Sequence, residues 1–369
     1  MKLTVKSKFL DYSVITSSLP QLNSSMINDE ESFYIIDSEI IRIYSSKVNF
    51  HGLQKFISFP AKEQNKTINY TEKIIGKLLS LGVKRNSKMI CIGGGITQDV
   101  CGFIASILFR GIPWYFYPTT LLSQADSCIG GKTSLNVNRL KNLIGSFYPP
   151  QMIYVIPEFI LTLKSQDYFS GMGEIVKMHV IGGEDYMKRI ITNQAAIYRR
   201  DLSVLQDLIS NSLSIKTEYI EHDEFDQNKR VILNYGHTFG HALESITNYQ
   251  IPHGQAIIYG MIFSNIISFN RKSINKSTFD LINYKLFFPN LFAQYDLTKL
   301  SSENLISCIK VDKKQTDERM TMVLLTEENS LTAEKDISEN EIKLALNDFQ
   351  SLVTSNYARI NEQGGSDDW

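Results

Sequence analysis

A strand that runs into three consecutive glycines and then into a helix constrains the fold of this chain more than any other feature. Lys88–Ile92 has the character of a buried strand, and Gly93–Gly95 follow it. From Asp99 onward, apolar residues recur at the i, i+3, i+4, i+7 and i+8 positions of one helix face, and residues 112–117 form the next apolar run. A strand–helix–strand unit of this kind predicts a parallel sheet with helices on both faces.

The pattern changes near residue 167. Before it, strands such as 32–37 alternate with helices such as 68–81, and 369 residues are too many for one ordinary core. After it, helical spacing dominates, near 168–182, 201–221, 229–246, 254–270 and 338–355. We therefore predict an α/β domain over residues 1–166, a helical domain over 167–360 and a flexible polar tail over 361–369.

Composition excludes several classes of partner. The net charge is −1, and no dense run of lysine and arginine suggests a nucleic-acid surface. The N-terminus lacks the apolar segment of a secretory signal, and no apolar run approaches the roughly 20 residues that span a membrane. The four cysteines form no CxxC pair, which favours reduced, buried thiols. These features predict a cytoplasmic protein without a membrane or nucleic-acid partner.

The glycine turn could hold a nucleotide. Backbone N–H groups after a strand and before a helix can approach a pyrophosphate at the positive end of the helix. However, Gly93–Gly95 do not match GxGxxG, so a plain tight turn remains open. Asp99 could likewise be only a partner of the helix dipole.

A histidine cluster indicates a metal site. Three of the six histidines, His237, His241 and His253, lie within 17 positions, and the first two share one helix face. The best carboxylate to join them is Glu174, although it could instead be an exposed glutamate paired with Lys177. A Glu/His/His set with a vacant position is typical of a catalytic zinc, which polarises hydroxyl and carbonyl oxygens.

Several cations accompany these motifs without any net basic bias. Lys132 follows two glycines, which suggests close backbone approach to an anion. Each of the others taken alone is more often a surface charge, but together they suit a substrate with carboxylate and phosphate groups. The set comprises Lys132, Lys141, Lys177, Lys216 and Arg230.

Taken in order, the motifs resemble those of the dehydroquinate synthase family of sugar phosphate cyclases. The similarity extends from about Pro60 to Lys314. The matching stretches are Gly93–Asp99, Arg110–Gly111, Pro118–Thr133, Lys141–Phe147, Gly173–Lys177, Asn234–His241 and His253–Ala256. The resemblance implies an N-terminal Rossmann-like domain, an all-α metal-binding domain and a homodimer.

The resemblance also implies roles for individual residues. The metal ligands, for Zn²⁺ or Co²⁺, would be Glu174, His237 and His253. The NAD contacts would be Asp37, Glu63, Lys66, Gly94, Gly95, Asp99, Thr119, Thr120, Lys132, Lys141, Phe159 and Thr162. The substrate contacts would be Asp126, Lys132, Asn142, Lys177, Lys216, Arg230, Asn234 and His241. Arg110 would reach the phosphate site of a neighbouring subunit, and Lys313 or Lys314 would be a further phosphate contact.

The implied reaction is that of 3-dehydroquinate synthase in the shikimate pathway of aromatic amino acid biosynthesis. It takes 3-deoxy-arabino-heptulosonate 7-phosphate to 3-dehydroquinate by transient oxidation with NAD, phosphate elimination, re-reduction and an intramolecular aldol step. Departures from the family pattern, at Lys62, Gln98, 138–140, Phe225 and Asp226, leave the substrate open. The alternatives are a specialised cyclase acting on an amino analogue, sedoheptulose 7-phosphate or a longer keto-sugar acid, a metal-dependent polyol dehydrogenase, or an inactive binding protein.

Overall fold

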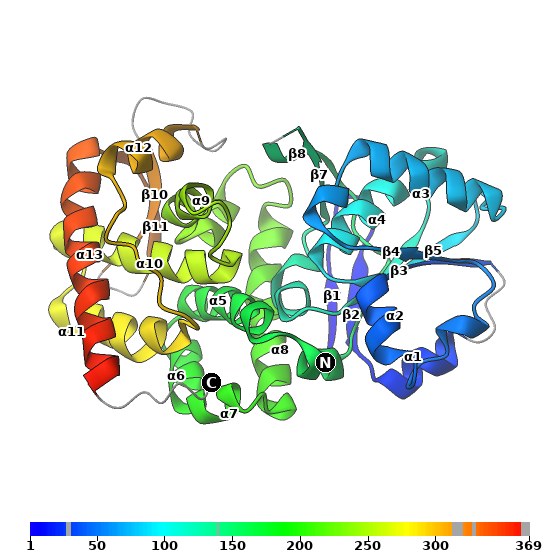
Figure 1. Ribbon diagram of the computed structural model, residues 1–369, viewed down its shortest axis with the longest axis horizontal. Coiled ribbons are helices and arrows are strands. Elements are labelled where there is room, and N and C mark those ends of the chain that lie inside the picture. The colour runs from blue at the N-terminus through cyan, green and yellow to red at the C-terminus, as the bar shows by residue number, and fades with distance from the viewer. Residues whose placement is uncertain (27–30, 139, 312–319, 327–329, 363–369) are drawn as a thin grey trace. The chain divides into compact units, whose positions relative to one another are not determined.

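The protein divides into an α/β unit and a helical unit. This computed structural model describes residues 1–26, 31–138, 140–311, 320–326 and 330–362 (Figure 1). The α/β unit comprises Met1–Lys164 and Arg199–Phe225, and the helical unit comprises Ser165–Tyr198 and Asp226–Trp369. The prediction begins the helical domain at residue 167 and assigns residues 199–225 to it, whereas the helical unit begins at Ser165 and residues 199–225 belong to the α/β unit. That segment forms α8 (Leu202–His222), which packs on β1 and on the turn at Ser123–Ser127, and periodicity predicts a helix without predicting its neighbours.

A seven-stranded sheet forms the centre of the α/β unit, in the order β1-β2-β9-β6-β5-β3-β4. All neighbouring strands are parallel except the β1–β2 pair. The central strands are buried on both faces, which explains their continuous apolar runs. The predicted strand–helix–strand unit is therefore confirmed. The strands are β1 (Lys2–Val5), β2 (Tyr12–Thr16), β3 (Ser32–Asp37), β4 (Phe56–Phe59), β5 (Lys88–Gly93), β6 (Trp114–Pro118) and β9 (Met152–Val155).

Helix α4 follows the glycine turn and begins earlier than predicted. It spans Gly95–Ile107, with Gly94 as its N-cap, and it buries Val100, Phe103 and Ile104 of the expected face, whereas Ile107 at the i+7 position is exposed. Asp99 consequently lies beyond the first turn, where a helix-dipole role is weak. The other helices of this unit are α1 (Leu19–Ser25), α2 (Ser38–Tyr44) and α3 (Ile68–Ser80), and a separate hairpin pairs β7 (Lys132–Val137) with β8 (Leu140–Phe147).

The helical unit is built around α10 (His253–Asn270). This helix is buried on every side from Gly254 to Ser268, because it packs against α5, α9 and α13 (Figure 1). The helices of this unit are α5 (Ser165–Gly182), α6 (Glu184–Thr192), α7 (Gln194–Tyr198), α9 (His237–Ile246), α10, α11 (Lys276–Asp280), α12 (Ser302–Val311) and α13 (Glu339–Glu362). None of the described helices is long and apolar enough to cross a membrane.

Three details of the helical unit differ from the sequence-based prediction. An antiparallel hairpin of β10 (Met320–Leu325) and β11 (Leu331–Ile337) interrupts the all-α pattern. Periodicity missed β10 because it is buried almost throughout and so does not alternate. The predicted helix at 229–246 is two elements, a 3₁₀ turn at Lys229–Asn234 and α9. Residues 361 and 362 end α13, and the rest of the predicted tail lies outside the described residues.

His179 in α5 predicts an acid-sensitive helical unit. Burial of the imidazole, with the nearby Arg189 charge, lowers its pKa from 6.5 to about 4, although its Nδ1–H donates to the Ile175 carbonyl 2.8 Å away. The unfolded chain therefore takes up this proton first as the pH falls, so the stabilisation is complete above pH 6.5 and is lost toward pH 4. At about 1.4 kcal/mol per pKa unit, the loss is on the order of 3 kcal/mol.

This acid dependence can be measured by urea unfolding of wild type and His179→Asn from pH 7.5 to 4. The variant keeps a donor but cannot titrate, so its free energy of unfolding should fall less steeply with acid. If the free energy of unfolding falls equally with pH in the two proteins, His179 does not contribute to the acid sensitivity of the fold.

Candidate metal centre and nucleotide site

Glu174, His237 and His253 come together in the helical unit. Glu174 lies in α5, His237 is the first residue of α9, and His253 is the first residue of α10. Glu174 Oε1 lies 3.1 Å from His253 Nε2 and 3.7 Å from His237 Nε2. One donor atom from each residue falls within 4.8 Å of the other two. Three helices thus direct one oxygen and two nitrogens at a common point, a donor set that fits Zn²⁺ or Co²⁺.

Two glycines make this convergence possible. Gly173 precedes Glu174 and Gly254 follows His253, at the closest approach of α5 and α10. A Cβ at Gly254 would lie 1.8 Å from the Ser170 carbonyl oxygen, and one at Gly173 would lie 2.1 Å from the Gly254 carbonyl oxygen. Only glycine therefore allows the two backbones this contact, which the Gly254 N–H reinforces by donating to Ser170 Oγ at 3.1 Å. The sequence analysis did not find this role.

The carboxylate of Glu174 is buried and ionised. Its side chain is 2% exposed, and Lys177 Nζ lies 2.5 Å from Oε2. Burial alone would raise the pKa of Glu174, but Lys177, His253 and His237 together hold it well below its usual value. The alternative of an exposed Glu–Lys pair is therefore wrong about exposure, although the pairing exists. Lys177 contacts Oε2 and leaves Oε1 directed at both imidazoles.

Glu244 supports His253 from the other side of its ring. Glu244 Oε2 lies 3.1 Å from His253 Nδ1, opposite the nitrogen that faces Glu174. Burial would lower the pKa of His253, but these two carboxylates raise it to about 10. A carboxylate on the second nitrogen fixes the orientation of a ligating imidazole. The sequence analysis missed Glu244, although it follows His237 by seven residues and His241 by three and so shares their helix face.

A second group of possible ligands overlaps the first. His241 Nδ1 or Nε2, a Glu244 oxygen and a His253 nitrogen also lie within 4.8 Å of one another. The His241 ring centroid is 5.2 Å from that of His237 and 5.8 Å from that of His253. His241 thus lies beside both predicted histidine ligands.

In the α/β unit, a polar network joins three of the predicted contact residues. Lys66 Nζ lies 2.5 Å from Asp99 Oδ2 and donates to Asn142 Oδ1 at 2.6 Å. Ser134, which the sequence analysis did not select, donates to either Asp99 Oδ2 at 3.0 Å or Asn142 Oδ1 at 2.9 Å. Burial raises the pKa of Asp99, while Lys66 and Ser134 oppose that shift. Asp99 therefore has a specific partner in Lys66.

Five of the predicted NAD residues lie at or directly after the carboxyl ends of parallel strands, where α/β sheets bind nucleotides. Asp37 ends β3 and accepts from the Glu39 N–H at 3.0 Å, Gly94 and Gly95 follow β5, and Thr119 and Thr120 follow β6. Among the remaining candidates, Glu63 accepts from Asn136 Nδ2 at 2.8 Å, and Lys141 lies on β8.

Phe159 and Thr162 lie in the 3₁₀ turn Pro157–Thr162 after β9. Thr162 Oγ1 lies 2.8 Å from the Tyr44 hydroxyl. Phe159 is 1% exposed and packs edge-on against Tyr44 in the core, so only its backbone remains for a cofactor.

The predicted substrate residues are divided between the two units. Lys216 Nζ donates to the Asp126 carbonyl oxygen at 2.7 Å and lies 3.1 Å from Asp126 Oδ1. Lys177, Lys216 and Arg230 are buried, so the surface-charge alternative is wrong for these three.

Arg110 and Lys132 are exposed, and Arg110 has a φ of 67° in the turn after α4. The α/β unit holds Arg110, Asp126, Lys132, Asn142 and Lys216, and the helical unit holds Lys177, Arg230, Asn234 and His241. Lys313 and Lys314 lie outside the described residues.

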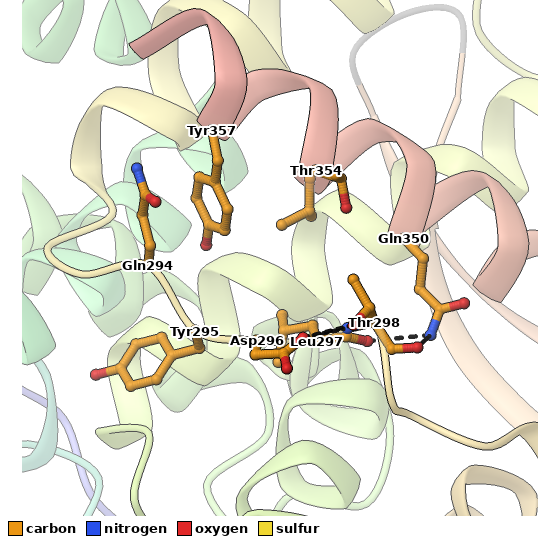
Figure 2. A pocket seen from close by; sticks show the side chains of 9 residues that line it. Gln294, Tyr295, Asp296, Leu297, Thr298, Gln350, Thr354 and Tyr357 are labelled. Carbon is orange, nitrogen blue, oxygen red and sulfur yellow. Dashed lines mark hydrogen bonds between the residues drawn. The ribbon is translucent and has the colours of Figure 1, made fainter. Parts of the chain in front are cut away.

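A pocket of about 270 Å³ lies elsewhere in the helical unit, between residues 294–298 and α13 (Figure 2). Its polar groups already bond within the protein. Gln350 Nε2 donates to the carbonyl oxygens of Leu297, Thr298 and Leu300 at 3.0 to 3.1 Å, and the Tyr357 hydroxyl contacts that of Tyr259. The Gln350 bonds fasten the loop to α13 and the tyrosine contact joins α13 to α10, so these groups do not indicate a ligand.

Solved structures of other proteins share the fold of this chain. The structure of 2-epi-5-epi-valiolone synthase from Streptomyces hygroscopicus subsp. jinggangensis, which contains NAD⁺ and Zn²⁺, matches with a TM-score of 0.83 at 19% identity, covering 94% of this chain and 99% of that one. A probable glycerol dehydrogenase from Sinorhizobium meliloti shares the fold at a TM-score of 0.59 and 12% identity, covering 93% of this chain and 97% of that one. Glycerol dehydrogenase from Schizosaccharomyces pombe shares it at a TM-score of 0.65 and 14% identity, covering 96% and 92%. The fold therefore defines a structural class that contains the valiolone synthase and glycerol dehydrogenases.

Sequence comparison selects one family within that class. Residues 56–170 match the family described as 3-dehydroquinate synthase N-terminal, and residues 171–315 match 3-dehydroquinate synthase C-terminal. The 3-dehydroquinate synthase of Clostridium tetani is 34% identical over 88% of this chain and 85% of its own length, and that of Thermoanaerobacter pseudethanolicus is 32% identical over 83% and 87%. The chain belongs to the 3-dehydroquinate synthase family.

Proposed function

We propose that this protein is a 3-dehydroquinate synthase. It converts 3-deoxy-arabino-heptulosonate 7-phosphate to 3-dehydroquinate and phosphate, with NAD and a Zn²⁺ or Co²⁺ ion as cofactors. The observation that carries the proposal is the convergence of Glu174, His237 and His253 within 4.8 Å, in a chain that belongs to this family. Relatives that carry this name are 32 to 34% identical over most of their length.

The metal and the nucleotide supply chemistry that side chains lack. When bound, the ion supplies Lewis acidity and NAD accepts and returns a hydride, so that the overall reaction is redox-neutral. Glu174, His237 and His253 would hold the ion, while Lys177 keeps the glutamate ionised and Glu244 keeps His253 in orientation. In the α/β unit, Lys66 pairs with Asp99 on α4, the helix that follows the glycine turn, and this network would contact NAD.

Other side chains act on the substrate. Lys216, fixed by Asp126, presents a buried ammonium group to a carboxylate or phosphate. Lys177 and Arg230 supply two more buried cations in the helical unit, and fixed cations stabilise the negative charge that develops during elimination and ring closure. His241 would transfer protons to or from the substrate.

The cationic side chains also favour a cyclase over the polyol dehydrogenase alternative. A neutral polyol requires no set of buried cations, whereas a phosphorylated keto-sugar acid carries two anionic groups. The departures at Gln98 and Asp226 keep a specialised sugar phosphate cyclase as the second candidate. That candidate differs in its substrate and shares the metal site.

Incubation of the purified protein with NAD, Zn²⁺ and a panel of sugar phosphates tests the function. Phosphate release and a carbocyclic product in equal amounts, without accumulation of NADH, are expected from the heptulosonate phosphate. Turnover of another sugar phosphate but not of this one would reject the proposed substrate. Net NADH formation from glycerol or a related polyol, without phosphate release, would reject the cyclase class.

The proposal extends to assembly and location. The resemblance to the family supports a cytoplasmic homodimer in which the exposed Arg110 reaches the phosphate site of the second copy. Light scattering of the purified protein would give a mass of twice 42.1 kDa for such a dimer. A monomer mass in the presence of NAD and metal would contradict it.

A further inference from the structure

We propose that Gln98 is a positioning residue that holds Asp126, and through it Lys216, in place. Gln98 is one of the departures from the family pattern, and its side chain is buried in the first half of α4. Its Nε2 donates to the Ser127 carbonyl oxygen at 2.6 Å, and its Oε1 accepts from Ser127 Oγ at 2.7 Å. Both ends of one carboxamide are thus bonded to a single residue 29 positions later.

Ser127 directly follows Asp126 and ends the π-helical turn Ser123–Ser127. Other groups fasten the beginning of this turn, because the Thr120 N–H donates to Ser123 Oγ at 3.2 Å and Gln124 Nε2 donates to the carbonyl oxygens of Pro118 and Ile156 at 3.1 and 2.8 Å. Its far end, which carries Asp126, is fastened to α4 by Gln98. Single π turns in proteins frequently mark functional sites.

The bond between Gln98 and Ser127 is transmitted to a buried cation. Lys216 Nζ contacts both the carbonyl oxygen and the carboxylate of Asp126, so its position depends on the Asp126 backbone as well as on the side chain. Without the Gln98 amide, the Ser127 carbonyl loses its donor and the backbone at Asp126 can shift. A displacement of about 1 Å in a substrate-positioning group can cost about 100-fold in rate. Gln98 therefore sets the position of the Lys216 ammonium group.

The kinetic part of this inference depends on the proposed function. Gln98→Met keeps the length of the side chain without its polar atoms, and Ser127→Ala removes the hydroxyl partner. Each should raise the KM for the heptulosonate phosphate about tenfold, while the dissociation constant for NAD stays within twofold. The KM of the double variant should be no higher than that of the single variant with the higher KM, since both substitutions remove the same contact. Ser127→Thr, which keeps the hydroxyl, should restore the wild-type KM.

Ser106→Ala is the matched control. Ser106 lies near the other end of α4 and also uses its hydroxyl in bonds, to the Phe103 carbonyl oxygen at 2.7 Å and to Ser146 Oγ at 2.9 Å. The Ser106→Ala substitution should leave the KM for the heptulosonate phosphate unchanged. If the KM of the double variant rises by the product of the increases in Gln98→Met and Ser127→Ala, the two residues act independently and the proposal is wrong. An unchanged KM in both single variants would also overturn it.

Amide hydrogen exchange separates this inference from the proposed function. Exchange at residues 123–128 should be faster in Gln98→Met and Ser127→Ala than in wild type or Ser106→Ala, whatever substrate the enzyme uses. If wild type does not turn over the heptulosonate phosphate but these amides exchange faster, the function is wrong and the positioning role remains. Unchanged exchange in both variants would reject the positioning role even in an active synthase.

Discussion

Glu174→Gln protein is expected to bind Zn²⁺ or Co²⁺ more than about 100-fold more weakly than wild type and to lose measurable turnover. Glutamine keeps the shape of the side chain but removes the charge that faces His237 and His253. Outer partners of metal ligands alone contribute about 10- to 100-fold to affinity, so loss of a ligand should cost more. The change also leaves the Lys177 ammonium buried without its counter-ion, which typically costs about 3–5 kcal/mol of stability.

Competition with a chromophoric chelator measures metal affinity without relying on activity. The matched control is Glu184→Gln on α6, since Glu184 pairs with Lys188 at 2.9 Å but both side chains are more than half exposed. Such surface pairs contribute at most about 1 kcal/mol. The control should therefore retain metal and activity. Metal retention by Glu174→Gln equal to that of wild type would remove Glu174 from the ligand set.

Gly254→Ala is expected to unfold the metal centre and to destabilise the helical unit by about 3 kcal/mol or more. The new Cβ would lie 1.8 Å from the Ser170 carbonyl oxygen, which is backbone and cannot rotate away. Helices α5 and α10 must then separate, and forced overpacking of this kind costs about 1–3 kcal/mol and occasionally more. Because Glu174 and His253 lie close to this contact, metal affinity should fall together with stability.

Gly76→Ala in α3 is the control for this substitution. A Cβ at Gly76 meets nothing within 4 Å, and alanine in the interior of a helix is favoured over glycine by about 0.5–1 kcal/mol. Thermal unfolding with and without Zn²⁺ compares the variants. An unchanged Tm and metal affinity in Gly254→Ala would show that the close contact does not hold the ligands together.

Sequence patterns were sufficient to predict those strands and helices whose burial shows directly in the spacing of apolar residues. The runs at β5 and β6 and the buried face of α4 were predicted because apolar spacing reports burial directly. Strand β10 was missed because a short strand that is buried almost throughout has no alternation. The position of α8 in the α/β unit was missed because periodicity carries no information about which core a helix joins.

The same limit applies to the candidate site. Histidine spacing and family motifs indicated the three residues that converge, and the structure brings them within 4.8 Å. Gly173 and Gly254 act through a backbone contact between helices distant in sequence, which no local pattern reports, whereas Glu244 shares a helix face with His237 and could have been predicted. Gln98 was noticed only as a departure, and its bonds to Ser127 give that departure a physical role.

Anomalous scattering at the metal edge from crystals of Zn²⁺- or Co²⁺-loaded protein is the most direct test of the metal site. A single peak should lie about 2.0–2.2 Å from one oxygen of Glu174, one nitrogen of His237 and one nitrogen of His253. A peak coordinated instead by His241, Glu244 and His253, or no peak at either group, would contradict the account.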